Sequence, residues 1–400
     1  MELNEEDVFR IEDNSLARTY MKRRIVITRG KGSRVWDIHG REYIDCTTGY
    51  GVGLAGHLHP KIMDAIRQQL ERLTVCHGSF YNDVRATFVE KLIRITPNGL
   101  NRMFISNSGT EAIECALKVA RKFTGKPGIV AMMKSFHGKT MGSLSATWNT
   151  KYREPFEPLV PGFTFVPYGK IDRVREAISE NTAAIIAEPI QGEGGVNIPP
   201  PAFFRELRET CDEKGLLLIA DEVQTGFGRT GKLWACEHWH VKPDIITLAK
   251  PVGGSLPMGV TVARDDIMSS FAMGEHSTTF GGNPLTCAAA SAFLDILKEE
   301  KLVEQAEIKG AEFKARLDDL KSRNPVIRET RGLGLMLAVE FRFDILNILL
   351  QSANNGLLIL DAGRNILRFL PPFVITSEDI TQTIAILDRV LKEGKYSVRD

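Results

Sequence analysis

The chain has 400 residues, with 51 basic and 50 acidic side chains, 35 glycines and 18 prolines. These proportions are ordinary for a globular protein, and they exclude a collagen-like, low-complexity or disordered chain. A net charge of +1 argues against a protein that binds nucleic acid or a membrane mainly through positive charge, so neither is expected as a partner. The length allows two or three domains and a large core.

The N-terminal segment MELNEEDVFRIED is acidic and lacks the basic start and apolar stretch of a signal or transit peptide. Apolar runs such as LLLIA and ILNILL are much shorter than the roughly 20 residues that a membrane span needs. The six cysteines are scattered and contain no CxxC pair, which is typical of reduced, structural thiols. We therefore expect a cytoplasmic protein.

Residues 1–50 contain a hairpin pattern, VWDIHGREYID, with its turn at His39 and Gly40, and we expect this segment to pack with the C-terminal domain. Gly51, Gly53 and Gly56 then match the spacing of the dinucleotide-binding fingerprint. No strand ending in an acid follows about 20 residues later, so nicotinamide binding is not expected. We interpret these glycines as positions where the backbone approaches a substrate pocket.

Between residues 101 and 250, short apolar runs alternate with amphipathic stretches such as EAIECALKVARKF and FFRELRETCDEK. The apolar runs are RMFISN, GIVAMM, TAAIIAEPI, LLLIADEV and DIITLAK. This alternation predicts βα units and a mostly parallel sheet covered by helices on both faces. The predicted fold class is therefore α/β, with a large domain over residues 51–290 and ligands beyond the carboxyl ends of its strands.

After about residue 284 the pattern changes to one long helical stretch through FLDILKEEKLVEQAEIKGAEFKARLDDL. The segments VIRETRG and LMLAVEF then resemble strands, and DITQTIAILDRVLKEG predicts a final helix. These elements predict a smaller α+β domain over residues 291–400, with a cleft between the two domains.

Several predicted strands end in polar residues that together match one kind of chemistry. A Ser-Gly-Thr turn at a helix start offers backbone N–H groups and a positive dipole end to a phosphate. A lysine can form a Schiff base with an aldehyde, and a carboxylate can keep a pyridine nitrogen protonated. Alone, each would be read as a surface or capping residue, but together they indicate pyridoxal 5'-phosphate (PLP). In chain order these residues are Ser108, Gly109, Thr110, Asp221 and Lys250, and Glu188 ends a further predicted strand.

Alternating Cys236, His238 and His240, and the pair His57 and His59, could suggest a metal site. The surrounding segment KLWACEHWHVKPD is typical of a helix or loop packed through its tryptophans, and no second ligand cluster accompanies it. We interpret these residues as structural and expect no metal.

A series of motifs along the chain resembles the class III aminotransferases, which are fold type I PLP-dependent enzymes. The motifs are NSGTEAIECALKVAR, SFHGKT, EPIQGEGGV, LLLIADEVQTGFGRTG with DIITLAK, STTFGGNP, RGLGLM and LRFLPP. The resemblance covers residues 32–372 and implies a transaminase with a large, mostly parallel sheet domain and a smaller α+β domain. It also implies a homodimer with shared active sites, although the choice between dimer and tetramer stays open.

The resemblance implies that Lys250 forms the Schiff base with PLP and that Asp221 pairs with the pyridine nitrogen. Val223, two residues along the predicted strand and so on the same side as Asp221, is expected to pack one face of the ring, with Phe136 on the other. Thr279 is expected to reach the phosphate in the neighbouring subunit. The full cofactor-binding set is Ser108, Gly109, Thr110, Phe136, His137, Asp221, Val223, Gln224, Lys250 and Thr279.

Five further residues form the implied substrate side of the site. Arg368 resembles the arginine that binds the substrate α-carboxylate, and Glu193 the carboxylate that pairs with it when the donor presents a distal amino group. Lys139 stands where many relatives carry an arginine that contacts the far carboxylate of glutamate, so we expect a weaker contact there. Tyr50 and Tyr81 align with tyrosines that face the donor in ornithine δ-aminotransferases.

We therefore predict an ω-aminotransferase that moves the terminal amino group of an α-blocked ornithine or lysine to 2-oxoglutarate, in lysine or arginine biosynthesis. The chain length and the segment SATWNTKYREPFEPL resemble the branch acting on N-acetylornithine or on amino acids attached to the acidic carrier protein LysW. The basic run Lys22-Arg23-Arg24 is interpreted as a solvated patch that an acidic carrier could use. The alternatives are an ornithine δ-aminotransferase, a 4-aminobutyrate aminotransferase, an aminomutase for glutamate 1-semialdehyde and a non-catalytic module.

Overall fold

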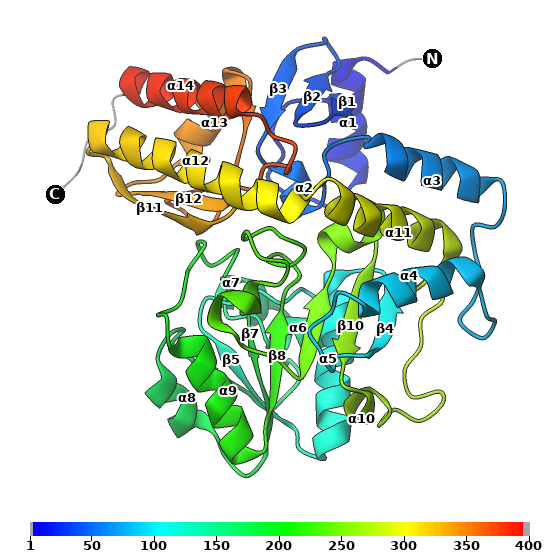
Figure 1. Ribbon diagram of the computed structural model, residues 1–400. Coiled ribbons are helices and arrows are strands. Elements are labelled where there is room, and N and C mark those ends of the chain that lie inside the picture. The colour runs from blue at the N-terminus through cyan, green and yellow to red at the C-terminus, as the bar shows by residue number, and fades with distance from the viewer. Residues whose placement is uncertain (1–2, 395–400) are drawn as a thin grey trace.

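A seven-stranded sheet forms the centre of the larger domain in the computed structural model, which describes residues 3–394 (Figure 1). The strand order is β4-β10-β9-β8-β7-β5-β6, and all neighbours are parallel except that β10 runs antiparallel to β4 and β9. The prediction of a mostly parallel sheet is confirmed. The strands are β4 (Arg102–Ser106), β5 (Gly128–Met132), β6 (Phe163–Val166), β7 (Thr182–Ala187), β8 (Leu217–Asp221), β9 (Ile245–Leu248) and β10 (Gly259–Ala263).

The strands β6 and β10 were not among the predicted strands. Strand β10 follows β9 through a 3-10 turn, η3 (Lys250–Gly253), rather than through an amphipathic helix, so the alternation that reveals the other strands is missing there. Strands β7 and β8 are buried at every position, which explains their continuous apolar sequences.

Helices cover both faces of this sheet, with α5 on one side and α8 and α9 on the other (Figure 1). The predicted apolar stripe of α5, Ile113, Ala116, Leu117 and Ala120, is buried. The helices of this part are α2 (Thr48–Gly51), α3 (Pro60–Leu70), α4 (Asp83–Ile93), α5 (Gly109–Thr124), α6 (Met141–Ser145), α7 (Thr150–Arg153), α8 (Ile171–Ala177), α9 (Phe203–Lys214) and α10 (Asp265–Met268), with 3-10 turns η1 (Glu154–Phe156) and η2 (Ala235–Trp239).

The C-terminal part contains a four-stranded sheet in the order β11-β12-β15-β14, with α12 and α14 packed together beside it (Figure 1). The single long helical stretch predicted here is wrong: it breaks into two helices at Glu300 and Lys301, where Lys301 takes a left-handed φ of 50°. The elements are α11 (Pro284–Glu299), α12 (Leu302–Arg323), β11 (Ile327–Leu333), β12 (Met336–Phe341), α13 (Leu346–Asn354), β14 (Leu360–Asp361), β15 (Ile366–Phe369) and α14 (Ser377–Glu393).

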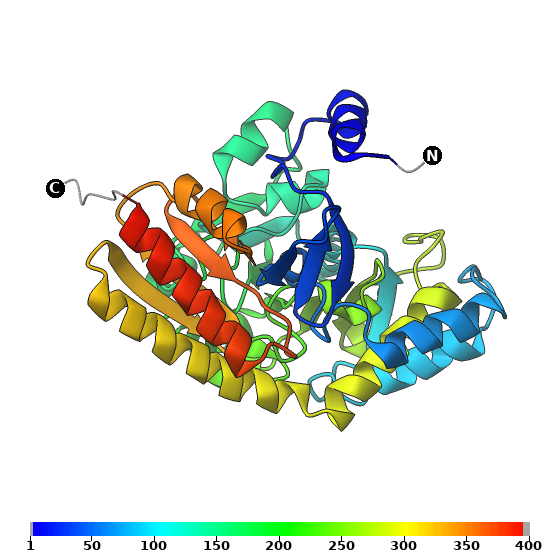
Figure 2. The same ribbon diagram turned by 90° about the horizontal axis from the view of Figure 1, so that it is seen from above.

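The N-terminal segment forms a third sheet, which lies beside the C-terminal elements when the molecule is viewed from above (Figure 2). The predicted hairpin is confirmed as β2 (Arg34–Asp37) and β3 (Glu42–Asp45), which pair antiparallel. Strand β1 (Ile27–Lys31) flanks the hairpin, and β13 (Leu357–Leu358) pairs parallel with β3. Helix α1 (Glu5–Ser15) precedes this sheet and contains no buried residue.

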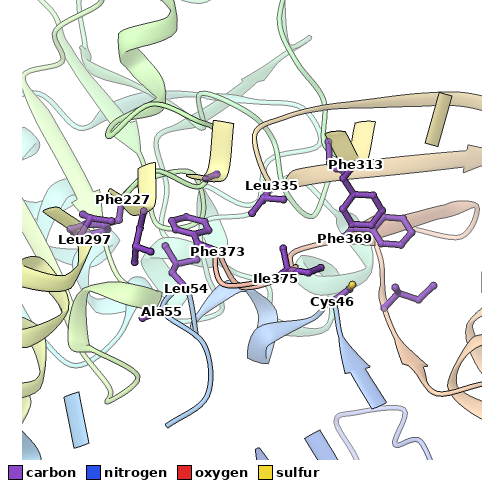
Figure 3. Close-up of a cluster of buried hydrophobic side chains, with 14 of the residues drawn as sticks. Cys46, Leu54, Ala55, Phe227, Leu297, Phe313, Leu335, Phe369, Phe373 and Ile375 are labelled. Carbon is purple, nitrogen blue, oxygen red and sulfur yellow. The ribbon is translucent and has the colours of Figure 1, made fainter. Parts of the chain in front are cut away.

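One continuous apolar cluster joins the three parts of the chain. In Figure 3, Phe373 from the C-terminal part lies between Phe227 of the large domain and Leu335, with Leu54, which follows α2, below. Cys46 of the N-terminal segment belongs to the same cluster. Residues 3–394 contain no helix that is both long enough and apolar enough to cross a membrane.

Candidate active site

A cavity of about 560 Å³ lies beyond the carboxyl ends of β7, β8 and β9, where the sequence predicted a ligand site. The walls come from the segments that follow these strands and from those that follow β4 and β5. The predicted site residues that line the cavity are Ser108, Gly109, Thr110, Phe136, His137, Lys139, Glu193, Asp221, Val223, Gln224 and Lys250.

Lys250 begins η3 immediately after β9 and Ala249, with a left-handed φ of 50°. Such a conformation is strained for a residue with a β-carbon and persists only where the surrounding structure holds it. Burial lowers the pKa of Lys250 to about 8, and the positive charge of Arg368 adds to this effect, while nearby carboxylates oppose it. About a tenth of this amine is therefore neutral and nucleophilic at pH 7, far more than for an ordinary lysine.

Asp221 is 4% exposed and is held by three hydrogen bonds. Its Oδ2 lies 2.7 Å from His137 Nδ1, and its Oδ1 accepts hydrogen bonds from Thr247 Oγ1 at 3.2 Å and from the backbone N–H of Val223 at 3.0 Å. The fixed carboxylate can stabilise a proton on a ligand ring nitrogen.

Val223 lines the cavity, but the prediction that it shares a strand face with Asp221 is wrong. Strand β8 ends at Asp221, so Val223 does not share a strand face with it. The Asp221 carboxylate instead accepts the N–H two residues on, which turns the chain and brings the Val223 side chain to the cavity.

The first turn of α5 forms a cradle suited to a phosphate. Ser108 is the N-cap of this 16-residue helix, whose first N–H groups have no acceptor within the helix. Thr110 Oγ1 lies 2.6 Å from Ser143 Oγ, and Gly138 sits against this pair. A β-carbon at Gly138 would come within 2.4 Å of Thr110 Oγ1 and 2.5 Å of Ser143 Oγ, so only glycine fits there.

Arg368 lies on β15 and is completely buried at the edge of the cavity. Its Nη2 is 2.7 Å from Glu193 Oε1, and its Nη1 donates to Gln224 Oε1 at 3.2 Å. The Tyr50 ring centroid lies 5.7 Å from the guanidinium carbon. The Glu193 side chain is 32% exposed, so this carboxylate has a path to solvent that Arg368 lacks.

Lys139 lies over the face of Tyr152, with its Nζ 4.4 Å from the ring centroid. Tyr152 in turn packs edge-on against Phe136, with the ring centroids 6.1 Å apart. Tyr152 was not among the predicted site residues, because its contact with Lys139 depends on α7 folding back over the segment after β5. Lys139 is exposed and also lines the cavity, so its charge lies at the rim of the site.

Four predicted residues are not among those that line the cavity of this chain. Arg368 contacts the lining residues Glu193 and Gln224, and Tyr50 lies near Arg368, whereas the other two lie elsewhere. Tyr81 is fully exposed in the segment between α3 and α4, and Thr279 is exposed in the segment before α11. Thr279 was expected to act on a neighbouring copy, whereas the expectation that Tyr81 faces the donor is not met within one chain.

Glu188 was noted as a strand end but received no role in the predicted site. It lines the cavity, is 6% exposed, and accepts the backbone N–H groups of Phe136 and Gly192, each at 3.0 Å. Burial raises the pKa of Glu188 to about 7; the nearby His137 opposes this shift and Asp221 adds to it. The other lining residues without a prediction are Val52, Asn107, Gly138, Ile190, Thr225, Ala249, Ser255, Leu256, Pro257 and Met258.

The glycine fingerprint has a packing role that was not predicted. Gly51 and Gly56 approach Leu370 and Val374, so these glycines fit the N-terminal turn to the C-terminal part rather than to the pocket, although Val52 between them lines the cavity.

In the basic run, Lys22 and Arg24 are exposed, as predicted for a solvated patch, and both pair with acidic residues of α1. Lys22 Nζ lies 2.9 Å from Glu12 Oε2 on α1, Arg24 pairs with Glu6, and Arg23 donates to the Ile359 carbonyl. No group of three or more potential metal ligands was found within residues 3–394.

Comparisons with known proteins agree along nearly the whole chain. The family model described as aminotransferase class-III matches residues 15–391. The acetylornithine aminotransferase of Methanopyrus kandleri is 46% identical over 376 residues, which cover 94% of this chain and 96% of that protein. The LysW-aminoadipate semialdehyde transaminase of Deinococcus radiodurans is 46% identical over 375 residues, covering 93% of this chain and 87% of that protein. The structure of ornithine aminotransferase from Toxoplasma gondii has a TM-score of 0.94 at 36% identity, covering 98% of this chain and 96% of that one.

Proposed function

The chain belongs to the class III aminotransferases and is a PLP-dependent transaminase, and from this we propose that it moves the terminal amino group of an α-blocked ornithine or lysine to 2-oxoglutarate. The products are a semialdehyde and glutamate. The proposed donors are N-acetylornithine and lysine or ornithine attached to LysW, because the Methanopyrus relative is named for acetylornithine and the Deinococcus relative for LysW-aminoadipate semialdehyde. The observation that carries the proposal is the ion pair between buried Arg368 and half-exposed Glu193.

The residues of the cavity fit PLP part by part. The N-terminus of α5 and the glycine-only position at Gly138 suit the phosphate, the buried Asp221 carboxylate suits the pyridine nitrogen, and the Lys250 amine suits the aldehyde. When bound, PLP supplies an electron sink that stabilises the carbanion left after a substrate carbon loses its proton.

The chain's own groups position the cofactor and move the proton. We assign Lys250 Nζ to the covalent attachment of PLP and then to proton transfer, because its lowered pKa lets the amine accept and release a proton near neutral pH. Asp221, fixed by His137 and Thr247, holds the proton at the ring nitrogen. Phe136 and Val223 would cover the two faces of the ring and exclude water.

The pair of Arg368 and Glu193 would let one pocket accept two kinds of substrate. While Glu193 pairs with Arg368, the carboxylate neutralises the guanidinium. The pocket can then accept a donor through its uncharged chain and distal amine. A 2-oxo acid or glutamate would displace Glu193 and bind Arg368 through its α-carboxylate, with the planar guanidinium matching the carboxylate. Lys139 would then meet the far carboxylate as a single point charge.

We also propose a homodimer in which Thr279 reaches the phosphate site of the neighbouring copy. Large apolar side chains near Thr279 and Tyr81 are exposed in the single chain, Met273 at 104%, Phe80 at 69% and Phe280 at 58%. A second copy would cover them, since exposed apolar surface of this kind marks an interaction site.

Steady-state kinetics with N-acetylornithine, LysW-linked lysine, free ornithine and 4-aminobutyrate, each with 2-oxoglutarate, test the proposed donor class. We expect kcat/KM to be highest for an α-blocked donor. The second candidate is an ornithine δ-aminotransferase, favoured by the position of Tyr50 beside Arg368 and by the similarity to the Toxoplasma enzyme. A preference for free ornithine would overturn the first choice in favour of the second.

A further inference from the structure

Arg229 is a buried cation outside the cavity that has no role in the function proposed above. It lies in the segment that follows β8, eight residues beyond Asp221, and is 1% exposed. Within residues 3–394 its Nε and Nη2 have no hydrogen-bond partner. An unpaired buried charge is costly to desolvate, so its retention calls for a specific structural or functional reason.

The surroundings of Arg229 are apolar rather than acidic. The Phe373 ring lies 5.1 Å from its guanidinium carbon, and Figure 3 shows Phe373 among Leu335, Ile375 and Leu54 at the junction of the domains. Burial lowers the pKa of Arg229 to about 9, which agrees with a site that supplies little negative charge.

The two acceptors of Arg229 are backbone carbonyls from two different segments of the C-terminal part. Nη1 donates to the Leu335 carbonyl at 2.8 Å and to the Pro371 carbonyl at 2.6 Å. The Leu335 N–H donates in return to the Arg229 carbonyl at 3.0 Å. Gly334 packs so tightly on this segment that a β-carbon there would lie 2.4 Å from the Thr230 backbone.

The register of the small sheet places these carbonyls at one end of the strand pair that carries Arg368. Leu337 pairs with Phe369 and Ala338 with Arg368 in the antiparallel β12 and β15 ladder. Continuing that register by two residues sets Leu335 opposite Pro371. Arg229 therefore forms hydrogen bonds to the ends of both strands, and its acceptor Pro371 is three residues along the chain from Arg368.

The same large-domain segment also contacts Arg368 directly, through Gln224 Oε1 at 3.2 Å. Gln224 thus contacts the Arg368 side chain, and Arg229 contacts the backbone at the end of the strand that carries Arg368. We propose that Arg229 is a positioning residue, which fixes the β12 and β15 strand pair against the large domain and thereby sets the place of Arg368 in the cavity. This inference rests on the proposed binding of carboxylate by Arg368.

Hydrogen exchange of the holoenzyme, measured by mass spectrometry, tests the positioning step without using activity. In Arg229→Met the two carbonyls lose their donor, and we expect exchange in residues 366–370 to speed up by about tenfold. Arg208→Met is the matched control, because Arg208 on α9 is also poorly exposed but pairs with two carboxylates, those of Asp212 and Asp244. Unchanged exchange at 366–370 in Arg229→Met, or an equal increase in Arg208→Met, would overturn the proposal.

Steady-state kinetics then test whether the hydrogen bonds of Arg229 affect substrate binding. We expect Arg229→Met to raise KM for 2-oxoglutarate by about tenfold and KM for the ω-amine by less than about twofold, since only the carboxylate contact depends on Arg368. Arg229→Lys keeps a positive donor, should restore part of the effect, and serves if the methionine variant does not fold. Equal rises in both KM values would show a merely structural role. Arg368→Ala separately tests the proposed function, because it removes the carboxylate contact while leaving Arg229 in place.

Discussion

Replacing Glu193 by glutamine tests the two-state pocket most directly, since it removes the charge of the residue that competes with substrate for Arg368. The pair has a short contact of 2.7 Å, with Arg368 completely buried and the Glu193 side chain 32% exposed. A hydrogen bond to a charged group contributes about 1.5–3 kcal/mol. Glu193 is partly exposed, and the amide oxygen of glutamine can still accept from Arg368. The variant should therefore lose about 1 kcal/mol of this contact, which is about fivefold in an equilibrium constant.

The two half-reactions should respond in opposite directions. The KM for 2-oxoglutarate should fall by about fivefold, because its carboxylate no longer displaces another carboxylate. The kcat/KM for the ω-amine should fall by a similar factor, because a buried guanidinium then faces the donor without a neutralising charge.

Single-turnover absorbance measurements separate the half-reactions, with amine or 2-oxoglutarate added alone. Glu176→Gln is the control: Glu176 forms an exposed ion pair with Arg173 on α8 at 2.6 Å, so its loss should leave both half-reactions unchanged. Glu193→Gln shifting both half-reactions by the same factor in the same direction would refute the competition between Glu193 and substrate.

Three further outcomes follow from the site. In the cofactor-free enzyme, labelling of Lys250 by an amine-selective reagent, read by mass spectrometry, should rise as pH passes through about 8. The neutral amine is the reactive form, and burial lowers its pKa. A rise only near pH 10 would contradict the burial argument. Gly138→Ala should weaken PLP binding by about tenfold or more, read by equilibrium dialysis, because its β-carbon overlaps Thr110 Oγ1 and Ser143 Oγ; unchanged binding would remove the cradle assignment. Asp221→Asn should lower kcat by about 10²-fold or more while the fold persists, and near-normal kcat would disprove its role at the ring nitrogen.

The cofactor half of the site could be predicted because it follows from local rules. Parallel strands bring their carboxyl ends to one edge, so Asp221 at the end of β8 and Lys250 after β9 had to lie close together. The same rule marked Glu188, yet its function as an acceptor of two backbone N–H groups depends on how the segments after β5 and β7 fold over one another.

The substrate half depends on contacts between domains that no local pattern encodes. The resemblance singled out Arg368 and Glu193, but their pairing is set by the position of the small sheet. Tyr152 beneath Lys139 likewise became visible only in the structure. The break near Lys301 escaped prediction because the charged and apolar residues on both sides continue a helical pattern, and neither glycine nor proline marks the turn.

The net charge of the chain is near zero, but charge is unevenly distributed around the cavity. Each nearby carboxylate already has partners: Asp221 has His137, Glu188 has two backbone N–H groups, and Glu193 has Arg368. The positive charge available to ligands is then that of Lys139, Lys250 and the N-terminus of α5, together with Arg368 once a carboxylate displaces Glu193.

Anionic ligands would therefore bind to these positive groups. Binding of PLP and a dicarboxylate should raise the unfolding temperature together by more than PLP alone, through mass action on the folded state. Glutarate, a non-reactive dicarboxylate, allows this to be measured by calorimetry without turnover. A monocarboxylate such as butyrate is the control, because it lacks the second carboxylate for Lys139 and should raise the unfolding temperature less. Equal effects of glutarate and butyrate would show that Lys139 contributes nothing to carboxylate binding.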